Sequence, residues 1–555
     1  MLRKKPIILA ARKHFVFVAS LFIFSVLRIN AGPTFANAVT NGIIDIPKLT
    51  EASGIAESRN NANVIWTEND SGNAAVVYAI DNQGRLLGTY VLPSNTDNED
   101  LGIGPGPVTN VSYLYVTDIG DNNVNRTNIA IYQAPEPTVY AGKQVTVPLT
   151  NAPMKGMRTI FLTYPDGAHN AEAEFADPIS GDWFIITKDS TGSIYTAPKS
   201  LMDTSTNIML KYVEPLNFDV ANGADISPLG DEIVVRQENF AQLWARTNGE
   251  AITNALAGPY TSIPVQGIAN GEPNGEAIGF DYYGSGYFTI SDSESKGIQP
   301  LRYFARTSAD GPTPPTALVP MAASWKYLAN GSNQGTTWQS PAFSDSAWST
   351  GTAQLGYGGS NVQTIVSYGP SSSSKYITTY FRNTFSVTNA SRIAALTLKL
   401  AVNDGALVYL NGSPVTNLNL AFGAAYNTTA TAMTNTLRDT WQSFPVNPDL
   451  VVEGTNVIAA EVHLASGTAT NLVFDLQLNA TVAPAITTVT PLANSQQKLT
   501  LAGSSNSPTT IQATTNFTTW TTLGSLVLTN SNGMFTDSLA PNFPMRFYRA
   551  YRAVP

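Results

Sequence analysis

The feature that most constrains the fold is an acidic unit that recurs five times between residues 50 and 295. Each unit has an acidic residue, an apolar strand, a turn and a second strand, as in "NAEAEFADPISGDWFIITKDSTG" (170–192), and two more strand patterns follow. The acidic positions are Glu51, Glu99, Glu172, Asp225 and Glu276, with a long gap of 73 residues between the second and third. Four short antiparallel strands in each period of roughly 50 residues are typical of a β-propeller.

The repeat therefore predicts an all-β chain that begins with a five-bladed β-propeller, and the long gap leaves room for a sixth blade. The fifth unit ends after three strands, and "GIIDIP" (42–47) can supply its fourth, which leaves no free sheet edge. Later strand patterns, broken by turn dipeptides such as Asn411-Gly412, predict a jelly-roll β-sandwich. The expected domains are a signal peptide (1–38), the propeller (39–308), a linker (309–322), the jelly roll (323–483) and a small β-sandwich (484–555).

The amino terminus predicts export. Six basic residues and an apolar stretch precede "FANA", whose Ala36 and Ala38 fit a signal-peptidase site. A retained single-span anchor is the alternative. After cleavage we expect a secreted, monomeric protein at the cell surface, outside the cell or in the periplasm, without membrane contact.

Composition limits the chemistry. The chain has no cysteine and three histidines, so thiolate sites and imidazole clusters are excluded, and any metal must be bound mainly by oxygen. Residues 39–310 hold 32 acidic and 15 basic groups, which disfavours nucleic acid as a partner and favours cations.

The repeated acids have two interpretations. If Glu51, Glu99, Asp100, Glu172, Asp225 and Glu276 meet at one rim, a bound Ca²⁺ would compensate their charge. Alternatively, each carboxylate bonds backbone amides of the next sheet as a latch. A second set of acidic residues lies at the ends of the second strands: Asp70, Asp118, Asp121 and Asp292. Their main interpretation is that they form turns, and the alternative is that they contribute to the same site.

Catalytic candidates are weak. His169 is three residues before Glu172 and could act as a base, or be an ordinary loop residue. Lys188 and Arg236 could bind an anionic substrate, or pair with the acids. In the jelly roll, Trp338, Trp348 and Tyr357 could stack on sugar rings, or pin strands in the core.

Several motifs resemble known families. "WTENDSG", "NEDLGIGP", "YVTDIGDN" and "YPDGAHNAEA" resemble a family of secreted bacterial β-propellers without an assigned activity, loosely grouped with phytase-like and esterase-like propellers. "NDGALVYLNG" and "EGTNVIAAEVH" are similar to galactose-binding-like jelly rolls, and "IQATTNFTTW" to a C-terminal module of secreted Verrucomicrobia-type proteins.

Together these observations favour an exported binding or adhesion protein. Its propeller would be a cation-stabilised recognition platform, and its jelly roll would bind a carbohydrate or another extracellular polymer. The alternative is a secreted calcium-dependent hydrolase of ester or phosphoester bonds. The spread of the propeller's basic residues along the chain argues against a dense phosphate site.

Overall fold

The structure is a computed structural model that describes residues 32–141, 149–247, 249–267, 271–292, 298–308, 315–388, 390–434, 436–503, 508–528 and 532–552. The predicted signal peptide lies outside the described residues up to position 31, and so does part of the predicted linker. The all-β prediction is confirmed. The described α-helices are short, α1 (Lys199–Met202) and α2 (Ile252–Leu256), and none is long and apolar enough to cross a membrane.

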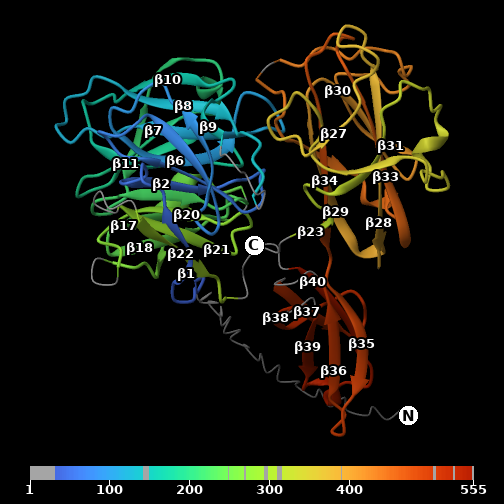
Figure 1. Ribbon diagram of the computed structural model, residues 1–555. Coiled ribbons are helices and arrows are strands. Elements are labelled where there is room, and N and C mark those ends of the chain that lie inside the picture. The colour runs from blue at the N-terminus through green and yellow to red at the C-terminus, as the bar shows by residue number, and fades with distance from the viewer. Residues whose placement is uncertain are drawn as a thin grey trace, which may run out of the picture. The chain divides into compact units, whose positions relative to one another are not determined.

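The described part of residues 39–305 forms five sheets, in each of which strands adjacent in the chain pair antiparallel (Figure 1). The first has β2 (Ala52–Glu57), β3 (Val64–Asn69), β4 (Val76–Asp81) and β5 (Leu86–Val91). The second has β6 (Asn98–Pro105), β7 (Ser112–Asp118), β8 (Ile129–Pro135) and β10 (Arg158–Thr163). The third has β11 (Ala171–Ala176), β12 (Trp183–Thr187), β13 (Ser193–Ala197) and β15 (Lys211–Pro215).

The fourth and fifth sheets follow the same order. The fourth has β16 (Gly223–Ile226), β17 (Glu232–Gln237), β18 (Phe240–Ala245) and β19 (Tyr260–Ile263). The fifth has β20 (Asn274–Phe280), β21 (Gly286–Asp292), β22 (Ile298–Ala305) and, as its last strand, β1 (Val39–Asp45). Since β1 pairs antiparallel with β22, the prediction that residues near 42–47 complete the fifth unit is confirmed.

Two strands were not predicted. β9 (Leu149–Pro153) lies in the long gap and adds parallel to β5, and β14 (Asn207–Met209) adds parallel to β10. The described residues of the gap therefore extend existing sheets and form no sixth one.

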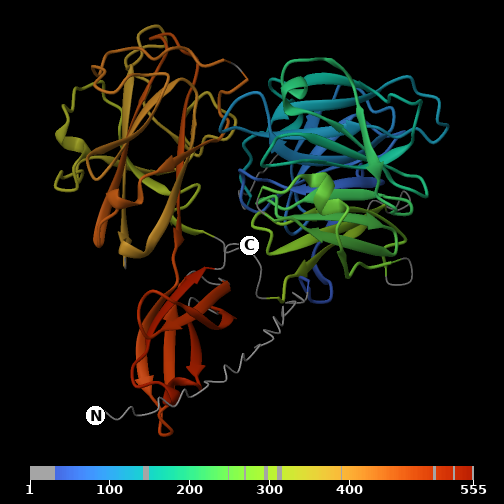
Figure 2. The ribbon, with the colours of Figure 1, turned by 180° about the vertical axis from the view of Figure 1, so that it is seen from behind.

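The five sheets are packed in a cycle. Each first strand contacts the next along the chain, and β20 contacts β2. Five hydrophobic clusters fill the spaces between successive sheets, and the cluster with Ile55, Tyr78 and Phe288 joins the fifth sheet to the first. Both views show this blue-to-green segment as one group of short strands (Figures 1 and 2). Residues on both faces of the first strands are buried, including their polar side chains such as Asp100 and Glu174.

The next part of the chain is a sandwich of two six-stranded sheets. One contains β27 (Thr364–Ile365), β26 (Leu355–Tyr357), β34 (Leu472–Val482), β29 (Ile393–Val402) and β32 (Gln442–Val446), and β23 (Thr316–Val319) pairs with β34. The other contains β25 (Ser349–Thr352), β24 (Ser324–Leu328), β28 (Thr378–Val387), β33 (Gly454–His463), β30 (Gly405–Leu410) and β31 (Ser413–Leu418). Trp325, Phe381 and Phe474 pack in the core between them. The 3-10 turns η2 (Thr337–Gln339), η3 (Ala390–Arg392) and η4 (Pro448–Leu450) lie in its loops.

The last described residues form two three-stranded sheets around a small core with Leu499 and Ile511. Their strands are β35 (Ala485–Pro491), β36 (Gln497–Ala502) and β39 (Asn532–Asp537), and β38 (Thr521–Val527), β37 (Pro508–Thr514) and β40 (Phe547–Arg552), with η5 (Ala540–Asn542) before β40.

Candidate active site

A β-bulge near the start of the first strand recurs in the sheets and directs one glutamate away from the regular ladder. In β6, Asn98 pairs with Asp118 and Asp100 with Thr117, so Glu99 is the extra residue. The same shift makes Glu172 extra in β11 and Glu276 extra in β20. Bulges re-aim the side chain of the extra residue and are frequent next to active sites.

The bulged residues lie close to Asn222, which precedes β16, and together they form a set that we call the glutamate ring: Ser53, Glu99, Glu172, Asn222 and Glu276. Ser53, in the irregular stretch of β2, donates its hydroxyl to Glu99 at 3.4 Å. Asn222, just before β16, donates its side-chain amide to Glu172 at 3.2 Å. Lys188, after β12, forms an ion pair with Glu172, and its charge also acts on Glu99 and Glu276.

Burial shifts the carboxyl groups of the ring towards their protonated forms. Burial, followed by the charge of Glu172, raises the pKa values of Glu99 and Glu276 well above those of ordinary carboxyls. Burial also raises the pKa of Glu172, but the opposing Lys188 charge and hydrogen bond limit this rise to about 7. Glu276 keeps part of its surface exposed, although its carboxyl lies among protein atoms. The ring therefore combines two carboxyl groups with strongly raised pKa values and a third, Glu172, whose pKa lies near neutral pH.

A second carboxylate group adjoins the ring. Asp70, Asp97 and Glu99 each place one carboxylate oxygen within 4.8 Å of the others. Burial raises the pKa values of Asp70 and Asp97, which shows that protein atoms replace water around them. A Cβ atom at Gly120 would come within 2.2 Å of a Glu99 oxygen and 2.5 Å of an Asp97 oxygen, so a larger residue there would displace these two carboxyl groups. Three hard oxygen ligands in such a space fit a divalent cation such as Ca²⁺.

Two buried amides near these acids lack complete hydrogen bonding. The side-chain oxygen of Asn222, which is 2 % exposed, has no partner among the described residues. Neither polar atom of the Asn98 side chain has one either. An unpaired buried acceptor costs about 1–3 kcal/mol, so a ligand with donors or positive charge would stabilise this region.

The aspartates of the second set hold neighbouring loops and strands, and of the three described next only Asp121 bonds within its own turn. Asp118 accepts backbone N–H groups from Thr96 (3.1 Å) and Asp97 (3.2 Å) and pairs with Arg126 at 2.8 Å. Asp121 accepts the backbone N–H of Arg126 at 2.7 Å, and Asp292 accepts the side-chain amide of Asn274 at 3.0 Å. Of this predicted set, Asp70 belongs to the three-carboxylate group.

Three of the predicted metal ligands accept hydrogen bonds from protein groups outside the glutamate ring. Glu51 precedes β2 and accepts the side-chain amide of Asn73. Asp225 accepts backbone N–H groups from Phe280 (2.7 Å) and Ile226 (2.8 Å) and lies 3.7 Å from Arg59. Asp100 also accepts backbone N–H groups. Asp225 and Asp100 thus match the latch alternative, because their oxygens serve the backbone of neighbouring strands.

The three predicted catalytic residues lie in different surroundings, and only one of them belongs to the glutamate ring. Lys188 belongs to the ring. Arg236 is fully buried, pairs with Glu272 at 2.5 Å and donates to the backbone of Ala277, so it cannot reach a substrate. His169 lies 3.2 Å from Asp166 and 2.9 Å from the hydroxyl of Tyr195, and no contact with the ring is described for it.

The prediction of a sugar-stacking surface is wrong for the three aromatic residues chosen. Trp338 is 0 %, Trp348 7 % and Tyr357 9 % exposed. Trp338 and Trp348 pack together in a cluster with Tyr380 and Tyr409, and Tyr357 lies in the main core of the sandwich. An aromatic side chain in a hydrophobic core has no exposed face on which a sugar could stack.

Sequence reasoning missed Ser53, Asp97 and Asn222. Asp97 could have been found, because it stands two residues before Glu99 in the same acidic motif. Ser53 and Asn222 are not acidic, and only their hydrogen bonds to Glu99 and Glu172 show that they belong with the glutamates.

No family model matches the chain, and no curated protein matches its sequence. The resemblance to a family of secreted β-propellers therefore has no support from these comparisons. Solved structures that resemble part of the chain include a Bacteroides uniformis β-glucuronidase (16 % identity, 42 % of this chain and 27 % of that one, TM-score 0.21) and a β-glucuronidase from an uncultured Clostridium sp. (10 %, 40 % and 39 %, 0.20). A Bacteroides vulgatus β-glycosidase is a third (13 %, 44 % and 29 %, 0.19).

The prediction of a binding or adhesion protein is contradicted, because the structural neighbours are named as glycosidases, and it is not carried further. This chain spans less than two thirds of each neighbour's length.

Proposed function

We propose that the five sheets within residues 39–305 are the blades of a five-bladed β-propeller, and that this propeller is a hydrolase whose reaction occurs at the glutamate ring. The cyclic contacts of the first strands support the propeller, because they bring the starts of all five strands to one central place. The hydrolase rests chiefly on one observation: a lysine-paired carboxylate and carboxyl groups with raised pKa values share that place.

The ring has the two kinds of group that acid–base hydrolysis needs. Glu276 is partly exposed and its pKa is raised by burial, which suits a general acid that protonates the leaving oxygen. Glu172 is held towards its ionised form by Lys188, which suits a general base that removes a proton from water. Two carboxyl groups in these roles are sufficient to cleave a glycosidic bond.

Charge favours a neutral substrate. The basic residues near the ring, Lys188 and Arg126, are both paired with carboxylates. The site keeps an excess of acidic groups, which would repel a phosphate or a uronate but accept hydrogen bonds from sugar hydroxyls. We therefore propose a neutral carbohydrate as the substrate, in preference to a phosphoester.

A cation is a further part of this proposal. Asp70, Asp97 and Glu99 would hold Ca²⁺, supported by the closeness of their oxygens. The bound ion would supply positive charge that organises the ring and orients sugar hydroxyls. The acid and base roles remain with Glu276 and Glu172.

The test is a panel of chromogenic substrates: neutral aryl glycosides, an aryl glucuronide, an aryl phosphate and an aryl acetate. We expect turnover of a neutral glycoside and a loss of about 10²–10⁴-fold in kcat for Glu276→Gln and for Glu172→Gln. Asp219→Asn, at an exposed aspartate, is the matched control and should keep full activity. Wild-type protein that cleaves no glycoside, or ring variants as active as Asp219→Asn, would overturn the proposal.

A further inference from the structure

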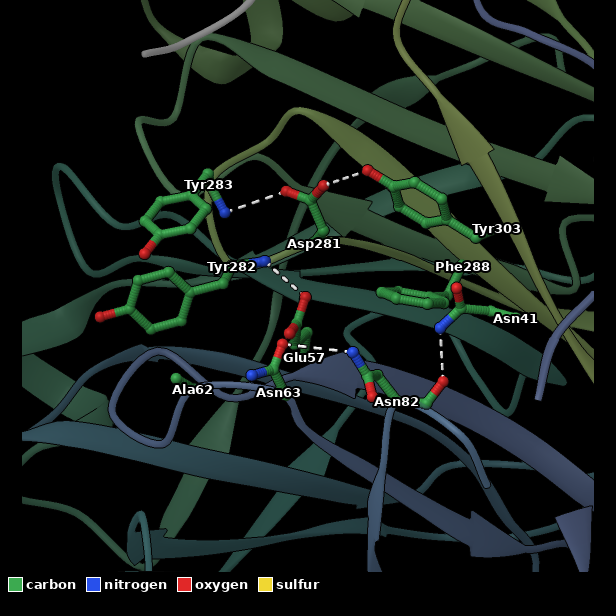
Figure 3. Close-up of a pocket in the computed structure, with 10 residues that line it drawn as sticks. All are labelled: Asn41, Glu57, Ala62, Asn63, Asn82, Asp281, Tyr282, Tyr283, Phe288 and Tyr303. Carbon is green, nitrogen blue, oxygen red and sulfur yellow. Dashed lines mark hydrogen bonds between the residues drawn. The ribbon is translucent and has the colours of Figure 1, made fainter. Parts of the chain in front are cut away.

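A cavity of about 260 Å³ lies between the first and fifth sheets, at the ends of their first strands (Figure 3). Glu57 is the last residue of β2, and Asp281 directly follows β20. The glutamate ring is at the starts of the first strands, so this cavity is a separate place in the same part of the chain. Figure 3 shows both carboxyl groups directed into the space, with Phe288 and Tyr303 along one side.

The two carboxyl groups differ in how their oxygens are used. Asp281 accepts the backbone N–H groups of Tyr283 (2.9 Å) and Ser285 (2.8 Å), and its other oxygen accepts the hydroxyl of Tyr303 at 2.6 Å. Asp281 is thereby engaged within the protein. Glu57 accepts the backbone N–H of Tyr282 at 2.7 Å and has more bonding capacity left.

Glu57 has no cationic partner in the described part of the chain, although its side chain is buried and the residue is only 6 % exposed. The guanidinium of the neighbouring Arg59 donates instead to the backbone oxygen of Glu57 at 2.9 Å and lies 3.7 Å from Asp225. Burial and the charge of Asp281 raise the pKa of Glu57 to about 8. The charge of Arg59 opposes this rise only in part, so the buried carboxyl is mostly protonated at neutral pH, and a cation that enters the cavity would favour its ionised form.

The rest of the lining suits an organic cation better than a metal ion. The rings of Phe288 and Tyr303 lie 4.9 Å apart and provide an aromatic wall, and ring faces attract ammonium groups. On another side, Asn82 donates its amide to Asn63 at 3.2 Å, which leaves amide groups to meet polar parts of a ligand. A divalent metal would need several free oxygens, and those of Asp281 already accept three hydrogen bonds.

We propose that this cavity binds the primary ammonium group of a small organic ligand, with the carboxylate of Glu57 as its ion-pair partner. The ammonium would lie between that carboxylate and the aromatic wall. Two kinds of molecule carry such a group at this size, an amino sugar and a short alkyl diamine. This site does not depend on the proposed hydrolase.

Calorimetric titration of the full chain with glucosamine and with putrescine tests the proposal, with glucose and N-acetylglucosamine as uncharged counterparts. We expect at least one amine to bind and neither uncharged sugar to bind measurably. Tighter binding of glucosamine would identify an amino-sugar site, and tighter binding of putrescine a linear-amine site.

Two variants locate the binding. Glu57→Gln keeps the size and the acceptor for Tyr282 but removes the charge, and we expect it to weaken amine binding about tenfold or more. Ala62→Trp, at the half-buried Ala62 on the cavity lining, should block entry without removing any core contact. Both should fold, bind Ca²⁺ and react with any glycoside as the wild type does.

The proposal fails if neither amine binds to the wild-type chain at millimolar concentration. It also fails if Glu57→Gln, shown by circular dichroism to be folded, binds amines as tightly as the wild type. If Glu57→Gln does not fold, unchanged amine binding by Ala62→Trp would overturn the proposal instead.

Discussion

The carboxylate of Asp100, in the second sheet, accepts a hydrogen bond from the backbone N–H of Ala224, in the fourth sheet, at 3.2 Å. The same oxygen accepts the N–H of Glu174, in the third sheet, at 3.0 Å, and the other oxygen accepts the N–H of Leu101 at 2.8 Å. One side chain therefore joins three sheets that are far apart in the chain. Burial raises the pKa of Asp100 well above its usual range, yet its acceptor oxygens are filled by backbone donors.

Asp100→Ala should be strongly destabilising. The substitution leaves three buried N–H groups without an acceptor, and each loss costs about 1–3 kcal/mol. We expect the free energy of unfolding to fall by about 3 kcal/mol or more in urea titrations. Asp100→Asn keeps one acceptor oxygen and should lose less, and Asp219→Asn should match the wild type. If Asp100→Ala is as stable as the wild type, the latch interpretation is wrong.

Calcium should stabilise the folded chain through Asp70, Asp97 and Glu99. A ligand that binds only the folded state stabilises it by about 2.7 kcal/mol at a hundredfold excess over Kd. We therefore expect Ca²⁺ to raise the melting temperature measured by calorimetry, and Asp70→Asn with Asp97→Asn to abolish this rise.

Magnesium serves as the control for that measurement. A site built from protein oxygens should favour the larger Ca²⁺ ion, because Mg²⁺ retains its water molecules. Equal effects of the two ions would indicate general charge screening. Identical melting curves in Ca²⁺ and in EDTA would exclude the cation site.

Stability should decrease as pH rises from about 5 to about 8. Burial raises the pKa of Glu68 to about 8, whereas in the unfolded chain it is near 4.5. Between these values the folded state binds a proton that the unfolded state has released, so the free energy of unfolding falls with rising pH. Glu57 shifts in the same direction.

Glu68→Gln isolates this contribution. The variant keeps an oxygen for the N–H of Gly54, which donates to Glu68 at 2.9 Å, but it cannot titrate. We expect its stability to decline less between pH 5 and 8, by about 2–4 kcal/mol compared with the wild type. The measurement is chemical unfolding at each pH. A wild-type profile that rises over this window would contradict the raised pKa values.

Lys188→Met should change the pH dependence of the proposed hydrolysis. Without the ammonium, burial acts on Glu172 unopposed, so the pKa of Glu172 rises and a smaller fraction is ionised at neutral pH. The acidic limb of the kcat/KM profile on a neutral aryl glycoside should move to higher pH, with lower activity at pH 7. Lys211→Met, at an exposed lysine, is the control. An unshifted limb would remove Glu172 from the role of base.

The position of signal cleavage should affect stability. We predict export with a cut near Ala38, yet Phe35 packs edge-on against Tyr287 at 4.9 Å and lies under the guanidinium of Arg306 at 5.0 Å. A chain that starts at residue 33 should therefore melt at a higher temperature than one that starts at residue 39. Intact-mass analysis of the secreted protein would show which form exists, and retention of Met1 would contradict cleavage.

Much of the local architecture was readable from the sequence because strand patterns depend on neighbouring residues. Apolar alternation and turn residues predicted the strands of all five units, and the incomplete fifth unit predicted its partner near residues 42–47, now seen as β1 paired with β22. The acids at strand starts also marked Glu99, Glu172 and Glu276 correctly as equivalent positions.

Only the tertiary structure shows which other polar residues lie beside Glu99, Glu172 and Glu276 in the glutamate ring. A one-residue bulge reverses the face on which a side chain emerges, and the sequence does not mark where the extra residue falls. Counting acidic residues therefore aligned Glu51 and Asp225 with the glutamates, whereas hydrogen bonds join Ser53 to Glu99 and Asn222 to Glu172. The sequence also left open whether Trp338 faces a sugar or lies in the core, and packing between strands distant in the chain buries it. Patterns of neighbouring residues specify strands, and only long-range pairing specifies which side chains meet.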